Sequence, residues 1–180
     1  RQWRSAAQVV WPLTAFTATR VHTLSRADGT VTLQMAELFA RSSEGAVVDQ
    51  RVNIRPGNTE EKSRAITLPK ARKYLVVSDS LEALSTYYLS PAAAAEAREK
   101  ASDPTCRQKS IGATVFAMKG VATLLGHHVV KLAAENKGAH FESWEAPELD
   151  CFPLYSLTIT KNADGSVNSR DEQVTTSVVT

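Results

Sequence analysis

The stretch Trp144–Leu154 reads Trp-Glu-Ala-Pro-Glu-Leu-Asp-Cys-Phe-Pro-Leu and lies between two strand-like runs. Proline has no N–H group for a sheet ladder, so Pro147 and Pro153 predict a bend or a sheet edge here. Cys151 falls inside this stretch, and Cys106 is the only other cysteine. Two interpretations follow: a disulfide that closes a loop of about 46 residues, or two separate buried thiols. The first predicts an exported β-protein.

The composition fits one domain of ordinary size. The chain has 180 residues, with 21 Lys and Arg against 19 Asp and Glu. A net charge of +2 is too balanced to predict nucleic-acid binding. No run of about 18 apolar residues exists, so the sequence predicts no transmembrane segment. The chain starts at Arg1 without methionine. We therefore expect a periplasmic or extracellular protein whose signal peptide has been removed, although a trimmed chain would start in the same way.

We expect a single domain over residues 1–180. Residues 1–12 carry Trp3, Val9, Val10 and Trp11, which predicts an N-terminal helix that packs on the sheet and ends at Pro12. No internal repeat or linker divides the rest of the chain.

Most of the remaining sequence is typical of antiparallel strands joined by short turns. Asp28-Gly29 between two β-like runs is a strong hairpin signal. From Ala46 to Arg55, Val48, Val52 and Ile54 alternate with polar residues, so one face should meet a core and the other water. Residues 58–64 are polar and predict a loop.

One segment has clear helix signals. Ser90 is a good N-cap, Pro91 suits the first helical position, and residues 92–101 are nearly all strong helix formers. Together these patterns predict an α+β, β-rich fold: a curved antiparallel sheet, or half-barrel, of roughly nine or ten strands, covered by one or two helices.

Recognisable catalytic and cofactor motifs are absent. His127 and His128 are adjacent, so in a strand they point to opposite faces and cannot share a metal. The sequence has no Gly-x-Ser-x-Gly elbow and no phosphate-binding glycine loop. Glu145, Glu148 and Asp150 form an acidic cluster, which is typical of a solvated loop and less often of acid–base chemistry or calcium binding. We predict no catalytic residue, no metal and no cofactor.

An apolar ligand site is the positive hypothesis. A long meander with one apolar face has to cover that face, and an alanine-rich helix covers only part of it. A curved sheet could then hold a ligand in its concavity. The candidate ligand-binding residues are Val31, Leu33, Met35, Phe39, Val48, Val52, Ile54 and Trp144.

Several motifs in sequence order resemble a group of uncharacterised bacterial secreted proteins. They are Ala-Asp-Gly (27–29), Arg-Ser-Ser-Glu-Gly (41–45), Ser-Asp-Ser (78–80), Thr-Tyr-Tyr-Leu-Ser-Pro (86–91), Asp-Pro-Thr-Cys (103–106), Leu-Gly-His-His-Val-Val-Lys-Leu (125–132) and Glu-Ser-Trp-Glu-Ala-Pro-Glu-Leu-Asp-Cys (142–151). In layout the chain is similar to lipoprotein-sorting carriers of the LolA/LolB kind, which have an antiparallel half-barrel over a cavity for acyl chains. The resemblance implies an exported location and a bonded Cys106–Cys151 pair.

The hypothesis that follows is an exported, non-catalytic binding protein that holds a lipid, an acyl chain or another apolar ligand in the concavity. The alternative is an envelope structural or protein-interaction module whose core is filled by side chains. A hydrolase is the third candidate. The expected partners are a lipid or an envelope protein, with no nucleic acid.

Overall fold

The computed structural model describes residues 13–54, 60–78, 82–96, 104–111, 113–136 and 138–180. The first half contains β1 (Phe16–Arg26), β2 (Val31–Arg41), β3 (Val47–Ile54), β4 (Glu60–Leu68), β5 (Lys73–Ser78), β6 (Ala83–Tyr88) and the short helix α1 (Pro91–Glu96). The second half contains β7 (Lys109–Ile111), β8 (Thr114–Leu124), β9 (His127–Asn136), β10 (Ala139–Ala146), the 3₁₀ turn η1 (Pro147–Leu149), β11 (Phe152–Lys161) and β12 (Val167–Val179).

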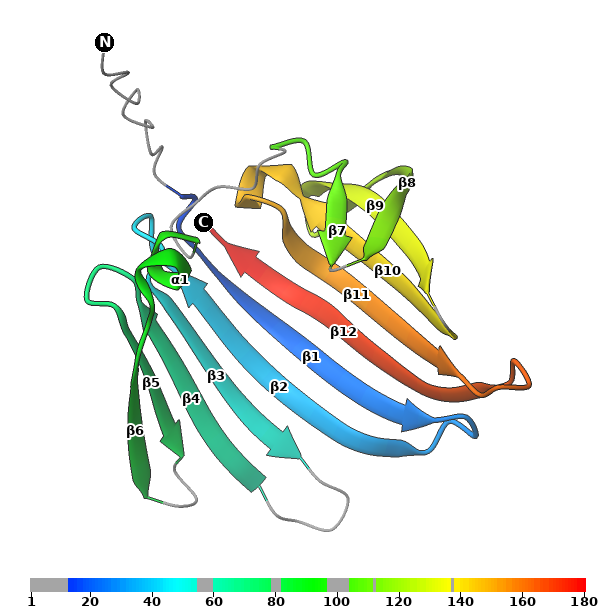
Figure 1. Cartoon of the computed structure of the whole chain (residues 1–180), viewed down its shortest axis with the longest axis horizontal. Helices are drawn as coiled ribbons and strands as arrows, with labels where there is room; N and C mark the ends of the chain where they lie inside the picture. Colours follow the sequence, from blue (N-terminus) through cyan, green and yellow to red (C-terminus); the bar gives the residue numbers. More distant parts are fainter. Residues whose placement is uncertain (1–12, 55–59, 79–81, 97–103, 112, 137) are drawn as a thin grey trace.

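The strands form one antiparallel sheet in the order β6-β5-β4-β3-β2-β1-β12-β11-β10-β9-β8-β7 (Figure 1). Each half of the chain is therefore a meander. The two meanders meet at the centre of the sheet, where β1 pairs with β12 over most of its length. Strands β6 and β7 form the two edges, so the sheet is not closed into a barrel.

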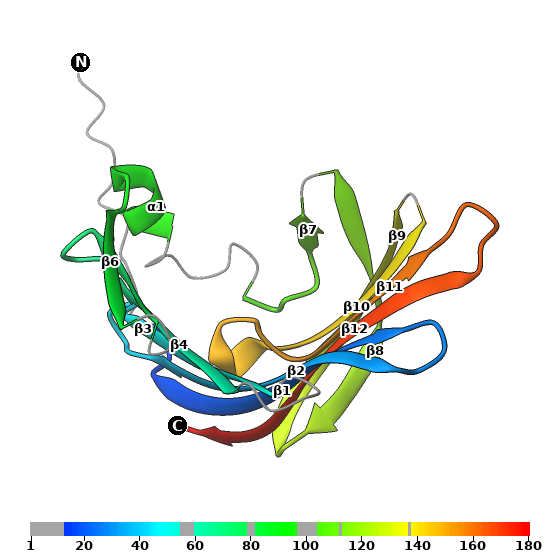
Figure 2. The ribbon, with the colours of Figure 1, turned by 90° about the horizontal axis from the view of Figure 1, so that it is seen from below.

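The sheet is strongly curved, and η1 and β7 lie inside the curve (Figure 2). Directly paired residues of neighbouring strands share a face of the sheet. The row Arg20–Glu37–Arg51 runs across β1, β2 and β3. The same face carries Phe16 and Phe39, and Phe152, the first residue of β11, packs against both rings. This face is therefore the concave face, and the opposite face is convex.

Turn chemistry explains the short connections. Gly29 has φ +83°, a left-handed backbone that glycine adopts without strain, and the Asp28 side chain accepts a hydrogen bond from the Thr30 N–H at 2.8 Å. Asp164 accepts the Ser166 N–H in the same way beside Gly165, between β11 and β12. The Asp-Gly hairpin predicted from the sequence is confirmed at β1–β2.

The helix signal is confirmed in part. Ser90 Oγ accepts the Ala93 N–H at 3.1 Å, as an N-cap does, and α1 begins at Pro91. The described helix ends at Glu96, and the remainder of the predicted 92–101 helix lies outside the described residues. The predicted N-terminal helix over residues 1–12 also lies outside them.

The strand count corrects the prediction of nine or ten strands to 12. The expected loop over residues 58–64 was wrong from Glu60 onwards, because β4 begins there, and residues 58 and 59 lie outside the described residues. Polar residues can occupy this strand because it pairs on both sides with β3 and β5, which satisfies its backbone. Strand β6 forms one edge of the sheet, and its residues are all exposed.

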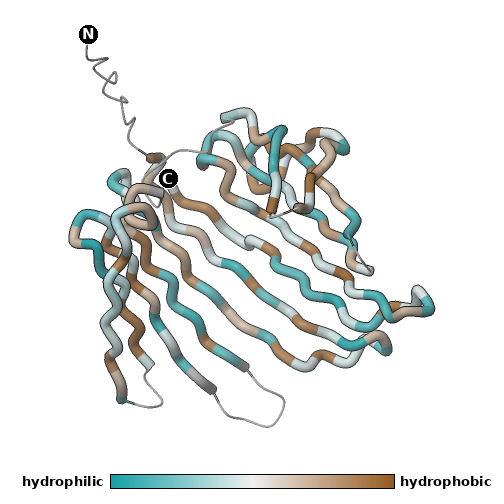
Figure 3. Tube along the Cα trace, in the orientation of Figure 1, coloured by the Kyte–Doolittle hydropathy of each residue, from teal (hydrophilic) through white to brown (hydrophobic). Residues whose placement is uncertain are grey.

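Helices contribute little cover in the described part of the chain. Helix α1 has six described residues and η1 has three, so the described helices cover much less of the sheet than the predicted one or two helices would. None of the described helices is long and apolar enough to cross a membrane. Hydrophobic and hydrophilic residues alternate along many strands (Figure 3), so each face of the sheet receives some apolar residues.

Candidate functional site

One end of the concave face is closed by an aromatic cluster. The rings of Phe16 and Phe152 lie 4.7 Å apart between centroids, and those of Phe39 and Phe152 lie 4.9 Å apart. Leu149 of η1 is fully buried in the same cluster. The bend predicted at Pro147 is this 3₁₀ turn, and it places its apolar residues over the sheet.

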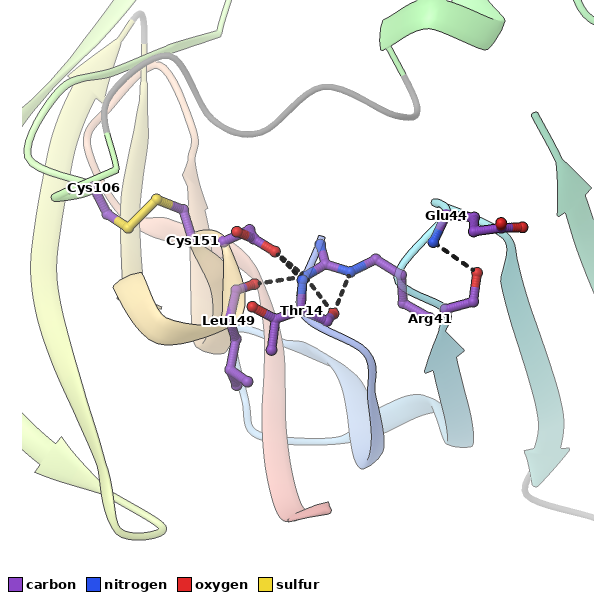
Figure 4. Close-up of polar contacts among 8 residues, drawn as sticks. Thr14, Arg41, Glu44, Cys106, Leu149 and Cys151 are labelled. Carbon is purple, nitrogen blue, oxygen red and sulfur yellow. Dashed lines mark hydrogen bonds and ion pairs between the residues drawn. A yellow bond between two sulfur atoms is a disulfide. The ribbon is translucent and has the colours of Figure 1, made fainter. Parts of the chain in front are cut away.

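Arg41 fastens η1 to the start of β1 (Figure 4). Its Nη2 atom donates to Thr14 O at 3.1 Å, to Leu149 O at 3.0 Å and to Asp150 Oδ2 at 2.7 Å. The Thr14 N–H donates to the same carboxylate oxygen at 2.8 Å. The two charged side chains are only 13% and 9% exposed. Burial lowers the pKa of Arg41, and the Asp150 carboxylate opposes that shift.

A disulfide covers a second part of the concave face. Cys106 is bonded to Cys151, and their Cα atoms are 5.5 Å apart. Cys106 packs on an apolar cluster from β8 and β9, formed by Phe116, Val130, Leu132 and Ala134. The bond predicted from the sequence is present, so the alternative of two separate thiols does not apply. Because Cys151 lies two residues after the end of η1, the bond joins the two covered regions.

The uncovered centre of the concave face is polar. It forms a pocket of about 270 Å³, the polar pocket, lined by His22, Met35, Glu37, Arg51, Ser156, Thr158, Asp171 and Gln173. These residues come from β1, β2, β3, β11 and β12, so the central pairing of the two meanders builds the site. The side chains of Arg51 and Asp171 are 48% and 47% exposed, which shows that the pocket opens to solvent.

Ion pairs order the floor of the polar pocket. Arg20 Nη2 lies 2.6 Å from Glu37 Oε1, and these side chains are 9% and 3% exposed. Gln173 Nε2 donates to the other Glu37 oxygen at 2.9 Å. Arg51 donates to Asp49 at 2.6 Å. The guanidinium of Arg20 also lies over the ring of Phe152, 4.9 Å from its centroid, so the polar and aromatic regions are in direct contact.

Burial and neighbouring charges shift two pKa values at this floor. Burial raises the pKa of Glu37 and the adjacent Asp49 raises it further, while Arg20 acts in the opposite direction. The hydrogen bond to Asp49 raises the pKa of Arg51. On the far side of the pocket, His22 Nε2 and Asp171 Oδ1 lie 2.5 Å apart. The pocket therefore offers fixed donors and acceptors of both charges.

The predicted ligand-binding residues lie on both faces of the sheet. Leu33, Met35 and Phe39 alternate along β2 on the concave face, whereas Val31 lies beyond a shift in register and pairs with Ser25. Met35 is the only one of these four residues that lines the polar pocket. Val48 and Val52 alternate with Asp49 and Arg51, so the register puts them on the convex face. Ile54 ends β3, and its side chain lies outside the described part.

Trp144 also lies on the convex face. Its register partners are Lys131 and Tyr155, and the Lys131 ammonium lies 4.0 Å from a ring centroid of Trp144. These eight residues therefore do not line a single cavity. Whether any of them contacts a ligand stays a prediction.

Glu37 is the residue of the polar pocket that the sequence alone could have indicated. It interrupts the apolar alternation of β2 between Met35 and Phe39, and it faces Arg51 across the strand pair. A charged residue at an inward position is rarely buried unless it is paired. That signal points to a polar site on this face.

The acidic cluster predicted near Pro147 is separated by the fold. Glu145 is buried and paired with Lys109. Glu148 bonds His127 Nδ1 at 2.6 Å, and Asp150 pairs with Arg41. Among the described residues, one His, Cys, Asp or Glu group brings its ligand atoms together, formed by Cys106, Glu145 and Cys151. Both sulfurs of that group are in the disulfide, so neither is a thiolate that could bind a metal.

Comparison with known proteins finds distant likeness of fold. No family model matches the chain, and no curated protein matches it. A chain of the Pseudomonas aeruginosa MucA/MucB complex is 17% identical, with a TM-score of 0.47; the match covers 92% of this chain and 51% of that one. This chain therefore spans about half the length of that relative.

Two smaller solved structures are matched over most of their length. A domain of the outer membrane lipoprotein-sorting type from Vibrio parahaemolyticus is 9% identical, with a TM-score of 0.37. The match covers 92% of this chain and 84% of that chain. A Bacteroides fragilis protein with a YmcC-like fold is 12% identical, with a TM-score of 0.39. The match covers 94% of this chain and 98% of that protein. The structural neighbours thus include the lipoprotein-sorting class that the sequence distantly resembles.

Proposed function

We propose that this chain is a non-catalytic binding module of the cell envelope that holds a segment of a partner protein in its polar pocket. One observation carries the proposal: the two buried apolar clusters of the concave face lie under η1 and the disulfide-linked segment, and the pocket at the uncovered centre is polar. An open surface of mixed donors and acceptors suits a polypeptide, whose backbone offers a donor and an acceptor at almost every residue.

The size and shape of the polar pocket support this choice. A volume of about 270 Å³ is below the range of typical small-molecule pockets, about 300–1,000 Å³. A polypeptide can lie along the curved sheet and insert one side chain there. Arg51, which is half exposed, offers a guanidinium for charge-assisted hydrogen bonds. The Cys106–Cys151 disulfide supports an exported location, because such bonds persist in oxidising compartments.

An amphipathic lipid is the second candidate. Leu33 of β2 and its partner Leu24 of β1 extend an apolar row beyond Met35 on the concave face. An acyl chain could lie on this short apolar row while a polar headgroup meets the pocket. The row is narrow compared with the polar residues around it, so we favour the polypeptide.

Site-specific photocrosslinking in the native host distinguishes these candidates. A photoreactive residue replaces Met35 in the polar pocket or, for comparison, Leu38, which is 40% exposed on the convex face of the same strand. We expect a protein adduct from position 35 and none from position 38. Arg51→Gln should lower the yield about tenfold, the equivalent of one lost charge-assisted hydrogen bond.

Arg170→Gln is the matched control. Arg170 is 45% exposed and pairs with Glu172 at 2.8 Å, as Arg51 pairs with Asp49, but it lies on the convex face. This variant should leave the adduct unchanged. A lipid adduct at position 35 would favour the second candidate, and equal adducts at positions 35 and 38 would contradict both.

A further inference from the structure

A second hollow lies on the convex face, away from the polar pocket. It is an open apolar groove of about 530 Å³ at the end of the sheet where β1 begins. One row of directly paired residues crosses it from β12 to β4: Val179, Thr17, Ala40, Val48 and Ile66. The side chains of Thr17 and Ala40 in the middle of the row are small, and larger ones stand on both sides.

The groove exposes apolar side chains to water. Val179 is 67% exposed at one end of the row, and Ala15 and Leu68 line the groove as well. Phe16, Arg41 and Val47, whose side chains the register places on the concave face, border the groove at the end of the sheet. An exposed apolar hollow of this kind marks a surface that another segment or molecule covers. The question is which occupant has the right chemistry and the right position.

The position of the preceding segment identifies the occupant. Leu13 is buried, and its N–H donates to Ser43 O in the β2–β3 turn at 3.0 Å, so the chain is anchored next to the groove. Ala15, on the groove wall, is three residues after Pro12. Three residues span at most about 10 Å. Residues 1–12 are therefore tethered within reach of the groove.

The composition of that segment fits an apolar groove. Residues 1–12 read Arg-Gln-Trp-Arg-Ser-Ala-Ala-Gln-Val-Val-Trp-Pro and contain two of the three tryptophans of the chain. They include no acidic residue. A short tether gives such a segment an effective concentration in the millimolar range, well above that of a second protein molecule. We infer that this groove is the docking site of residues 1–12 of the same chain, with a tryptophan as the main anchor.

Tryptophan fluorescence of the full chain tests this inference. In a Trp144→Phe background, the emission comes only from Trp3 and Trp11. We expect blue-shifted emission that is protected from acrylamide. Val48→Glu, which puts a charge in the groove, should shift the emission to the red and raise the quenching constant about twofold or more, because burial of the indole is lost.

Val52→Glu is the matched control, because Val52 lies on the same strand and face but outside the groove. It should leave the emission unchanged. If Val48→Glu fails to fold, 5-fluorotryptophan NMR of the otherwise unchanged chain provides the second readout, with protected signals from Trp3 or Trp11 expected. Emission like that of free tryptophan, protection that Val48→Glu does not alter in a folded protein, or protection that rises with protein concentration would overturn the inference.

Discussion

Replacing Asp150 with alanine is expected to lower the free energy of unfolding by about 3–5 kcal/mol. The change removes the carboxylate that pairs with Arg41 at 2.7 Å and leaves a guanidinium that is only 13% exposed without its counter-charge. The Thr14 N–H loses its acceptor as well. Urea unfolding followed by circular dichroism measures the loss.

Two further variants separate charge from backbone effects. Asp150 has φ +54°, a left-handed conformation that asparagine tolerates better than alanine. Asp150→Asn should therefore cost about half as much, because the amide oxygen can still accept hydrogen bonds. Glu44→Gln serves as an exposed control, since Glu44 pairs with Lys70 on the surface, and we expect about 1 kcal/mol or less. Equal effects of Asp150→Ala and Glu44→Gln would show that the buried pair does not hold η1 to β1.

Loss of the disulfide is expected to have the next largest effect. In the double variant Cys106→Ala/Cys151→Ala, the unfolded chain regains the freedom of a loop of about 46 residues, worth about 4 kcal/mol in the loop-entropy model. Both cysteines have positive φ values, but alanine also carries a Cβ atom, so the backbone cost is the same before and after the change. The difference in unfolding free energy therefore reports the bond itself.

Hydrogen exchange locates the effect. We expect amide hydrogen exchange to become faster in residues 104–111, which the bond holds against the β8–β9 cluster. Exchange rates in the rest of the described chain should change less. Addition of reductant should destabilise the natural chain and leave the double variant unchanged. A double variant as stable as the oxidised chain would show that packing of the segment alone keeps it in place.

Local signals predicted much of this fold. Asp28-Gly29, the Ser90 cap and the alternation of β3 each depend on neighbouring residues, and the structure contains all three. Strand β4 was missed at its start because Glu60 and the residues after it are polar. Its place in the sheet depends on pairing with β3 and β5, which no local pattern encodes.

The site could not be predicted in the same way. The alternation along β3 shows that Val48 and Asp49 lie on opposite faces of the sheet. It does not show which of the two faces is the concave one. Because ligand cavities are mostly lined by apolar side chains, the sequence predicts that the apolar side of β3 lines the concavity. In the structure the polar side faces inward, since Arg51 pairs across the sheet with Glu37, and Glu37 in turn with Arg20. Buried pairing of these charges offsets the cost of placing them there.

Methionine-methyl NMR during titration with oleate tests most directly whether the open concavity is a polar site. The chain has two methionines, and both lie on the concave face: Met35 in the polar pocket and Met118 on β8, opposite Leu132. We predict that neither methyl signal shows a saturable shift. A saturable one-to-one shift of the Met35 signal would contradict the account and identify the concavity as a site for an acyl chain.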